Sequence, residues 1–276
     1  MASSQERTGP GDPTVALLLT WFVPGAGHLY LGKVKLAVVA FLLIEGLYYL
    51  GYVLSEGLFL NVLPAEMRGM FAGMLAPEVG NMSALLLHMR TIGFLDQPQV
   101  WPSNMDLGMT LTAASGVLNF VLMSKAHLDA RGVKIEKQID PAGAAALSWC
   151  VPGLGHWLQG RRTRAVAVFG MLVGLFLIGC VLAQGANLDR ERHFYYWAGQ
   201  FLLGLPAIVA EFVHGHARVS QEIRYVDAGI VLGCVAGMLN ILVMLDVYGW
   251  AEHRAEAKSA DAPGAESAPS TEGSSA

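Results

Sequence analysis

The chain has few charged residues for its length. Of its 276 residues, 14% are Asp, Glu, Lys or Arg, whereas an average soluble protein has about 25%. The hydrophobic share is 54% and the mean hydropathy is +0.45. The charges gather in short segments and leave long runs almost uncharged. This distribution excludes an ordinary soluble domain and is typical of a protein that crosses a membrane several times.

An excess of basic charge is also lacking. The chain has 18 Lys and Arg residues against 22 Asp and Glu residues, which gives a formal net charge of -4. This balance excludes a basic protein that binds nucleic acid. We therefore predict no nucleic-acid partner, and the lipid bilayer is the partner that the composition indicates.

Cysteines and catalytic motifs are scarce. The three cysteines lie singly in apolar runs, without the paired spacing of disulfides or zinc sites. The sequence also has no Gly-x-Gly-x-x-Gly, Walker loop, Gly-x-Ser-x-Gly or His-Glu-x-x-His motif. We predict no metal, no cofactor and no enzymatic activity. The first apolar run ends at Pro24-Gly25 without an Ala-x-Ala-like site, so we also predict that no signal peptide is cleaved.

An internal repeat is the strongest feature that is present. Residues 19–32 (LTWFVPGAGHLYLG) align with residues 147–160 (LSWCVPGLGHWLQG), and eight of the fourteen positions are identical. Residues 106–119 align with residues 227–240, in the same order along the chain. Two matched blocks in one order indicate duplication of a whole unit. The offset between the copies is 128 positions in the first block and 121 in the second, so the middle of the unit has diverged.

The repeat and the hydropathy together predict the organisation of the chain. A spanning helix needs about 20 apolar residues, and each copy offers four such segments. The first copy has 14–31, 34–54, 69–89 and 107–124, and the second has 142–159, 165–183, 194–213 and 228–248. Segment 69–89 contains Pro77-Glu78 and either spans with a kink or lies at the interface. The predicted regions are a polar segment 1–13, a first membrane repeat 14–124, a polar linker 125–141, a second repeat 142–250 and a disordered tail 251–276.

The predicted fold is therefore all-α, with about eight transmembrane helices (range six to eight) in two homologous four-helix halves. Four spans in each copy would relate the halves by an axis along the membrane normal, and three would invert one half; we favour four. Basic residues lie both in the first short loop of each copy and in the linker. These regions lie on opposite sides if the first helix spans, and on one side if the Pro-Gly break makes that helix re-entrant.

The first repeated block carries a Trp-x-Val-Pro-Gly-x-Gly-His motif. Proline and glycine after an apolar run predict a bend that frees backbone carbonyls, and the histidine that follows can cap them. Alternatively, the two histidines converge on a proton path, whereas two are too few for a zinc site. The motif residues are Pro24, Gly25, Gly27, His28 and Gly32 in the first copy, and Pro152, Gly153, Gly155, His156 and Gly160 in the second.

Basic residues follow the last glycine of each motif. Lys33 and Lys35 in the first copy, and Arg161, Arg162 and Arg164 in the second, are expected at headgroup level. They act either as plain membrane anchors or as contacts for anionic lipid headgroups.

Three further polar residues fall inside apolar runs. Asn119 and Asn240 follow Gly116 and Gly237 by three residues, which predicts close helix packing with an amide bond across helices, or else a substrate contact. Glu45 lies in the middle of a span, and its counterpart in the second copy is Val173. A lone intramembrane carboxylate indicates a functional site, or a neutral hydrogen-bonded acid. Glu211, His214 and His216 are explained by a solvated helix end.

These motifs resemble a known family. The string at 24–33 resembles the start of the TM-two domain, a pair of membrane helices joined by a short turn. Together with the aromatic segment 195–206 and the Asp-x-Gly…Gly-x-Leu-Asn segment 227–240, it is similar to the bacterial domain-of-unknown-function family 6677. The resemblance covers most of residues 14–250, twice over, and is clearer in the second copy. It implies a multi-pass membrane protein without an assigned activity.

From these observations we expect a non-enzymatic structural or interaction protein of the bacterial cytoplasmic membrane, with another membrane protein or a second copy of itself as partner. The alternative is a small transporter or channel, in which Glu45, His28 and His156 line a path between the two repeats.

Overall fold

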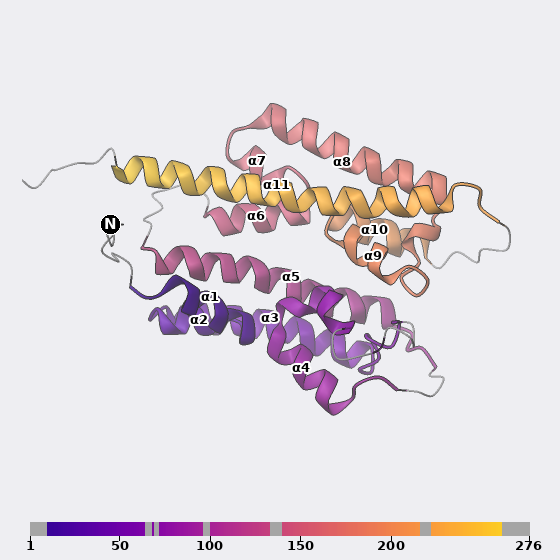
Figure 1. Ribbon diagram of the computed structural model, residues 1–276, viewed down its shortest axis with the longest axis horizontal. Coiled ribbons are helices and arrows are strands. Elements are labelled where there is room, and N and C mark those ends of the chain that lie inside the picture. Colours follow the sequence, from indigo (N-terminus) through magenta and orange to yellow (C-terminus); the bar gives the residue numbers. More distant parts are fainter. Residues whose placement is uncertain are drawn as a thin grey trace, which may run out of the picture.

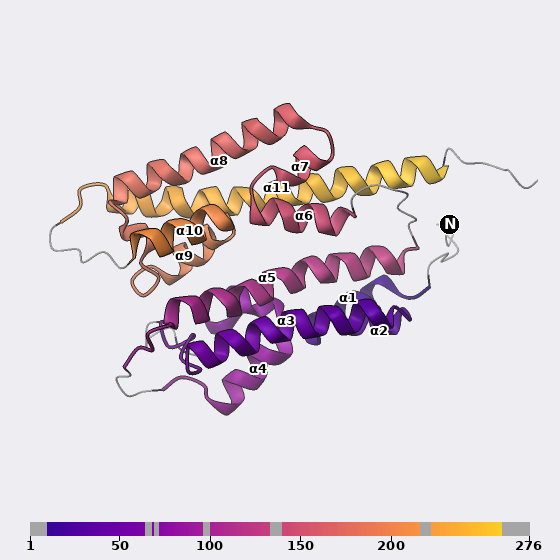
Figure 2. The ribbon, with the colours of Figure 1, turned by 180° about the vertical axis from the view of Figure 1, so that it is seen from behind.

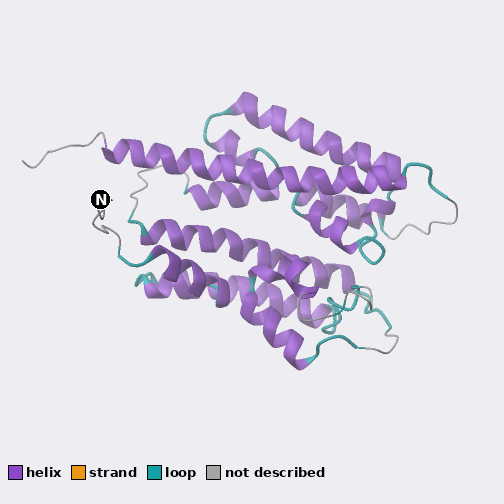
Figure 3. Cartoon of the chain, in the orientation of Figure 1, coloured by secondary structure: helices purple, strands orange, loops and turns teal. Residues whose placement is uncertain are grey.

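The computed structural model describes residues 10–63, 68, 72–95, 100–132, 140–215 and 222–260. Over these residues the fold is all-α and contains no strand, as Figure 3 shows. In the described part of the chain, four helices are long and apolar enough to cross a membrane: α3 (Val34–Leu54), α5 (Met105–Ala130), α8 (Arg162–Ala183) and the part of α11 from Val226 to His253. The coarse prediction of an all-helical protein with candidate membrane spans is confirmed.

The predicted number of about eight spans is not confirmed. The other apolar segments form helices of ten residues or fewer, about 15 Å long, which is half of the hydrocarbon core. Each predicted span at 14–31, 142–159 and 194–213 is split by a bend, and segment 69–89 begins with short 3₁₀ helices. The short helices are α1 (Pro13–Phe22), α2 (Ala26–Tyr30), η2 (Ala72–Leu75), η3 (Pro77–Gly80), α4 (Met82–Thr91), α6 (Pro141–Cys150), α7 (Leu154–Leu158), η4 (Ala186–Leu188), α9 (Phe194–Phe201) and α10 (Leu205–His214).

The two copies lie side by side with their long helices running in the same general direction (Figure 1). In the first copy α3 packs along α5, and in the second α8 packs along α11. The short pairs α1–α2 and α6–α7 lie toward one end of these long helices, and α4, α9 and α10 lie toward the other (Figures 1 and 2).

One end of the molecule collects the first loop of each copy and the residues that flank the linker. The Lys33 Nζ lies 2.8 Å from Asp129 Oδ2. The Lys125 Nζ lies 2.8 Å from Oδ1 of Asp140, the residue that precedes α6. Arg131 forms an ion pair with Glu252 near the end of α11. We call this the basic end; the first loops and the linker flanks share it, as expected if the Pro-Gly break makes the first helix re-entrant.

Glycine pairs allow the long helices of each copy to pack closely. A Cβ atom on Gly51 would lie 2.5 Å from the carbonyl oxygen of Gly108, and one on Gly229 would lie 2.5 Å from that of Gly179. These pairs occupy equivalent positions in the two copies. Small residues at the crossing point let helix backbones approach each other in membrane proteins.

Helix α11 continues to Ala260. Its last ten residues overlap the segment from 251 that was predicted to be a disordered tail, and residues 261–276 lie outside the described residues.

Candidate functional site

The Pro-Gly motif reverses the chain inside each copy. Gly25 and Gly153 have φ angles of +84° and +82°, which favour glycine. A Cβ atom at these positions would lie 2.4 Å from the carbonyl oxygen of Ala37 and 2.6 Å from that of Ala165, respectively. The short helix after the bend therefore returns toward the basic end, where Gly32 and Gly160, also with positive φ, turn the chain into the long helix.

The second glycine of the motif lets the returning helix contact the entering one. The backbone N–H of Gly27 donates to the Thr20 hydroxyl at 3.2 Å, and that of Gly155 donates to the Ser148 hydroxyl at 3.0 Å. A Cβ atom on Gly27 would lie only 2.0 Å from the carbonyl oxygen of Ala16. The two helices of each pair thus touch through backbone atoms.

Carbonyls at the inner ends of the short helices are capped by two side chains of the repeat. In the first copy the Trp21 indole donates to the carbonyl of Val79 at 2.8 Å, and the Asn119 amide donates to those of Thr20 and Gly80, each at 2.8 Å. These bonds satisfy backbone groups that would otherwise be unpaired in an apolar environment.

The second copy repeats this arrangement. The Trp149 indole lies 3.4 Å from the carbonyl oxygen of Phe201, and the Asn240 amide donates to the carbonyls of Ser148 (3.2 Å) and Leu202 (2.9 Å). Gly116 and Gly237 pack on the same short segments: a Cβ atom would lie 2.0 Å from the carbonyl oxygen of Pro77 or Gly199.

The two motif histidines do not meet. The side chain of His28 is fully buried, and its Nε2 lies 3.5 Å from Oδ2 of Asp129 in α5. The His156 Nε2 lies 2.9 Å from Oδ2 of Asp246 in α11. Each histidine therefore faces an aspartate on the last helix of its own copy, and this partner was not predicted from the sequence.

Burial favours the neutral form of both histidines. Desolvation lowers the pKa of His28 to about 4, although Asp129 opposes this shift. Burial also lowers the pKa of His156, against the opposing effect of Asp246. A neutral imidazole beside a carboxylate that binds a cation is a structural contact rather than a charge centre.

The same aspartates bind the basic residues that follow the motif. The Lys33 Nζ lies 2.8 Å from Asp129 Oδ2, and the Arg161 Nη2 lies 2.9 Å from Asp246 Oδ2. Lys33 and Arg161 are equivalent in the repeat, whereas the two aspartates are one helical turn apart in it, because Asp246 corresponds to Lys125. Arg164 also approaches Asp246, at 3.4 Å. Lys35 and Arg162 are exposed at the same end of the molecule.

Glu45 lies apart from both motif histidines. It lines a cavity of about 760 Å³ between α3 and α4, together with Tyr48, Tyr49, Tyr52 and His88. The cavity does not include His28 or His156. The structure therefore separates the three residues that a path between the repeats would need.

Buried charge in the second copy was missed by the sequence analysis. Arg190 is fully buried, and its Nη2 lies 2.6 Å from Oε1 of Glu211 in α10. The guanidinium group lies over the ring of Trp197, and the Trp197 indole donates to Glu211 Oε2 at 2.9 Å. The Arg190 guanidinium also donates to the Thr110 hydroxyl of the first copy at 3.2 Å. Glu211 is thus not at a solvated helix end, and His216, which belongs to the same prediction, lies outside the described residues. Only packing of α10 could show this, because Arg190 lies in a charged stretch that is typical of an exposed loop.

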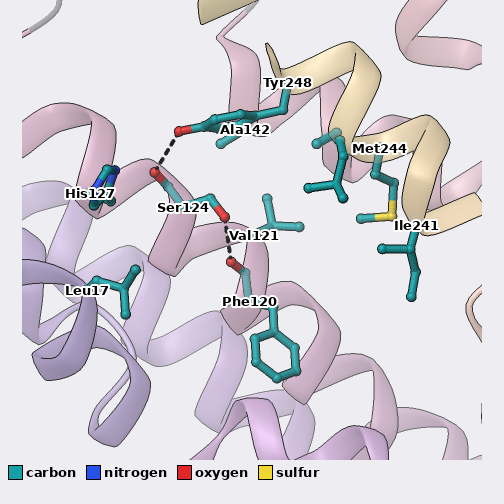
Figure 4. A pocket seen from close by; sticks show the side chains of 11 residues that line it. Leu17, Phe120, Val121, Ser124, His127, Ala142, Ile241, Met244 and Tyr248 are labelled. Carbon is teal, nitrogen blue, oxygen red and sulfur yellow. Dashed lines mark hydrogen bonds between the residues drawn. The ribbon is translucent and has the colours of Figure 1, made fainter. Parts of the chain in front are cut away.

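A second cavity of about 350 Å³ lies between the two copies near the basic end, and Figure 4 shows it. It is lined mainly by apolar side chains such as Phe120 and Met244. The Tyr248 hydroxyl donates to the carbonyl of Ser124 across this contact at 3.1 Å. The cavity is therefore a gap in the mainly apolar interface between the two repeats.

Comparison with known proteins gives a family and no activity. None of the curated proteins and none of the solved structures matches the chain. The model of a family of unknown function, DUF6677, matches residues 15–138 and again residues 143–260. These two matches cover most of the sequence and correspond to the two copies described above. The chain therefore belongs to this family and contains two tandem copies of its domain.

Proposed function

We propose that the protein is a multi-pass protein of the bacterial cytoplasmic membrane in which each copy crosses the bilayer twice. The pairs α1–α2 and α6–α7 would enter from the basic end and return, and α9–α10 would enter from the opposite end. A ten-residue helix reaches about half of the hydrocarbon core. The bonds from Trp21, Asn119, Trp149 and Asn240 support this proposal, because they satisfy backbone groups at the inner ends of the short helices.

The basic end is proposed to face the cytoplasm. Lys33, Lys35, Arg161, Arg162 and Arg164 lie there together with Lys125 and Arg131. Basic residues near the ends of spans favour the cytoplasmic side. Lys35 and Arg162 are exposed there, so anionic lipid headgroups are their expected ligands.

The proposed role is that of a non-enzymatic structural or interaction protein. One observation carries this proposal: the polar and small residues that recur in both copies are used in internal contacts. The tryptophans and asparagines cap carbonyls, the glycines allow backbone contact, and the histidines face aspartates of their own copy. The outward sides of α3 and α8 are apolar and exposed, and so are available to lipid, to another membrane protein or to a second copy.

Labelling of single cysteines in intact cells tests the proposed membrane arrangement. With the three native cysteines replaced, Lys35→Cys and Arg162→Cys should label only after the membrane is opened, whereas Glu191→Cys should label from outside. Leu172→Cys, which is fully buried, is the matched control for background labelling. Labelling of Lys35→Cys and Arg162→Cys from opposite sides would disprove the arrangement.

Photo-crosslinking in cells tests the interaction role. A photoreactive residue at Met171 or Ile178, both more than half exposed on α8, should give a discrete protein adduct. The same residue at the buried Leu172 should give none. Adducts with lipid alone at both exposed positions would contradict an interaction role for this face.

A further inference from the structure

The cavity beside Glu45 is a groove that the repeat contacts do not require. It lies between α3 and α4 and has a volume of about 760 Å³, within the usual range for small-molecule sites. Tyr48 joins the two helices that border the groove, because its hydroxyl donates to the carbonyl of Ala84 in α4 at 3.1 Å. Glu45 is near the middle of α3, so in the proposed arrangement the groove opens at mid-membrane depth.

One polar side chain of this groove has unused hydrogen-bonding capacity. His88 is only 3% exposed, lines the groove, and neither of its ring nitrogens has a hydrogen-bond partner. Its ring packs against Phe59 and Tyr52. Buried polar atoms without partners are uncommon and are a reason to look for a ligand.

The charge in the groove has one sign. Glu45 provides a carboxyl group, and neither lysine nor arginine is among the described residues that line the groove. Tyr49 and Tyr52 lie one turn and two turns after Glu45 on the same face of α3, with ring centroids 6.5 Å apart. A carboxylate beside aromatic rings is the combination that binds organic cations through ion pairing and cation–π contacts.

Apolar side chains flank this polar centre. Phe41 and Leu87 line the groove and are 42% and 64% exposed, respectively. A ligand that enters from the bilayer would therefore place its apolar part against them while its charged group approaches Glu45.

The second copy does not repeat the groove chemistry. At the 128-residue offset, Glu45, Tyr48 and Tyr52 correspond to Val173, Phe176 and Cys180. The helix contacts described above are present in both copies, so the fold does not need the polar residues of this groove. Their presence in the first copy requires another explanation.

We propose that the groove between α3 and α4 binds a lipophilic organic cation, with its charged group between the Glu45 carboxylate and the rings of Tyr49 and Tyr52. His88 forms a hydrogen bond with the polar part of the same ligand, as donor or as acceptor. Ligand entry from the bilayer rests on the proposed membrane arrangement, and binding in the groove needs no protein partner.

Equilibrium binding to the purified full-length protein in detergent micelles tests this proposal. The probe is tetraphenylphosphonium, and tetraphenylborate has nearly the same shape with the opposite charge. We expect saturable binding of the phosphonium, and binding of the borate that is weaker by roughly tenfold or more. Glu45→Gln should weaken phosphonium binding by roughly tenfold or more, because it removes the charge without changing the size.

Three further variants keep this test interpretable. Glu56→Gln removes an exposed carboxylate just beyond the end of α3 and should bind like the parent protein. Glu45→Asp keeps the charge and should retain most of the affinity, whereas Tyr52→Leu should give an intermediate loss. Equal binding by Glu45→Gln and the parent protein would overturn the proposal. A parent protein that does not bind, and whose Tyr49→Cys variant forms a disulfide dimer, would instead assign the groove to contact with a second copy.

Discussion

The two copies have equivalent helix contacts but different polar interiors. In each copy a tryptophan and an asparagine cap the inner ends of short helices, and glycines let the long helices touch. The differences lie around the later short helices of each copy, which are α4 in the first copy and α9 and α10 in the second. The contacts of the repeat therefore determine the backbone, whereas the residues between them can change.

Helices α4 and α10 show this difference most clearly. Each has ten residues, and the seventh is His88 in α4 and Glu211 in α10. Glu211 is bound by Arg190 and Trp197 in a closed network. His88 borders the open groove of Glu45 and has no hydrogen-bond partner. The second copy thus uses Glu211 in an internal network, whereas His88 of the first copy lines a groove without a hydrogen-bond partner.

Loss of Arg190 should have the largest effect on this comparison. Arg190→Met leaves Glu211 as a buried carboxylate without its cation, which typically costs about 3–5 kcal/mol. The double variant Arg190→Met with Glu211→Met should recover much of that stability. Thermal unfolding in detergent, followed by tryptophan fluorescence, measures both. A double variant as unstable as the single one would show that the ion pair is not what holds α10.

Alanine at the equivalent glycines should have the next largest effect, and a similar one in both copies. Gly116→Ala and Gly237→Ala each place a Cβ atom about 2 Å from a backbone carbonyl, and overpacking of this kind costs about 1–3 kcal/mol. Gly46→Ala and Gly170→Ala are the controls, because nothing lies within 4 Å of a Cβ atom there. Unequal losses at Gly116 and Gly237, measured by thermal unfolding, would contradict equivalent helix contacts.

Acidification should have the smallest effect and should act through the buried histidines. The pKa of His28 is lowered to about 4 by burial, so the unfolded chain binds a proton below about pH 6.5 that the folded chain does not bind. The contribution of His28 to stability is therefore present above pH 6.5 and is lost as the pH falls toward 4.

The corresponding measurement is the unfolding temperature at pH 7.5 and pH 5. It should fall on acidification, and it should fall less in the His28→Gln variant, whose side chain does not titrate. An identical fall in the variant would assign the pH dependence to other groups.

Much of the architecture was predictable from local sequence. The duplication, the helical class and the four long apolar helices follow from composition and repeated motifs, and the bends at Pro24-Gly25 and Pro152-Gly153 follow from residue type. The number of spans was not predictable, because an apolar run of 18 residues has the same hydropathy whether it crosses or turns back. The turn depends on what caps the freed carbonyls, and Asn119 is 99 residues from Thr20 along the chain.

The features of the candidate sites also fall into two groups: those that the sequence determines and those that only the packing decides. The sequence by itself determined that Glu45 is an acid in the middle of a long apolar run and without a counterpart in the second copy, since this requires only the run and the repeat offset. Only the tertiary structure decided that Glu45 shares a groove with His88, that each motif histidine faces an aspartate, and that Arg190 is buried against Glu211. The physical reason is that helical periodicity determines which face of a helix a side chain occupies, whereas its partner depends on how segments distant in sequence pack together.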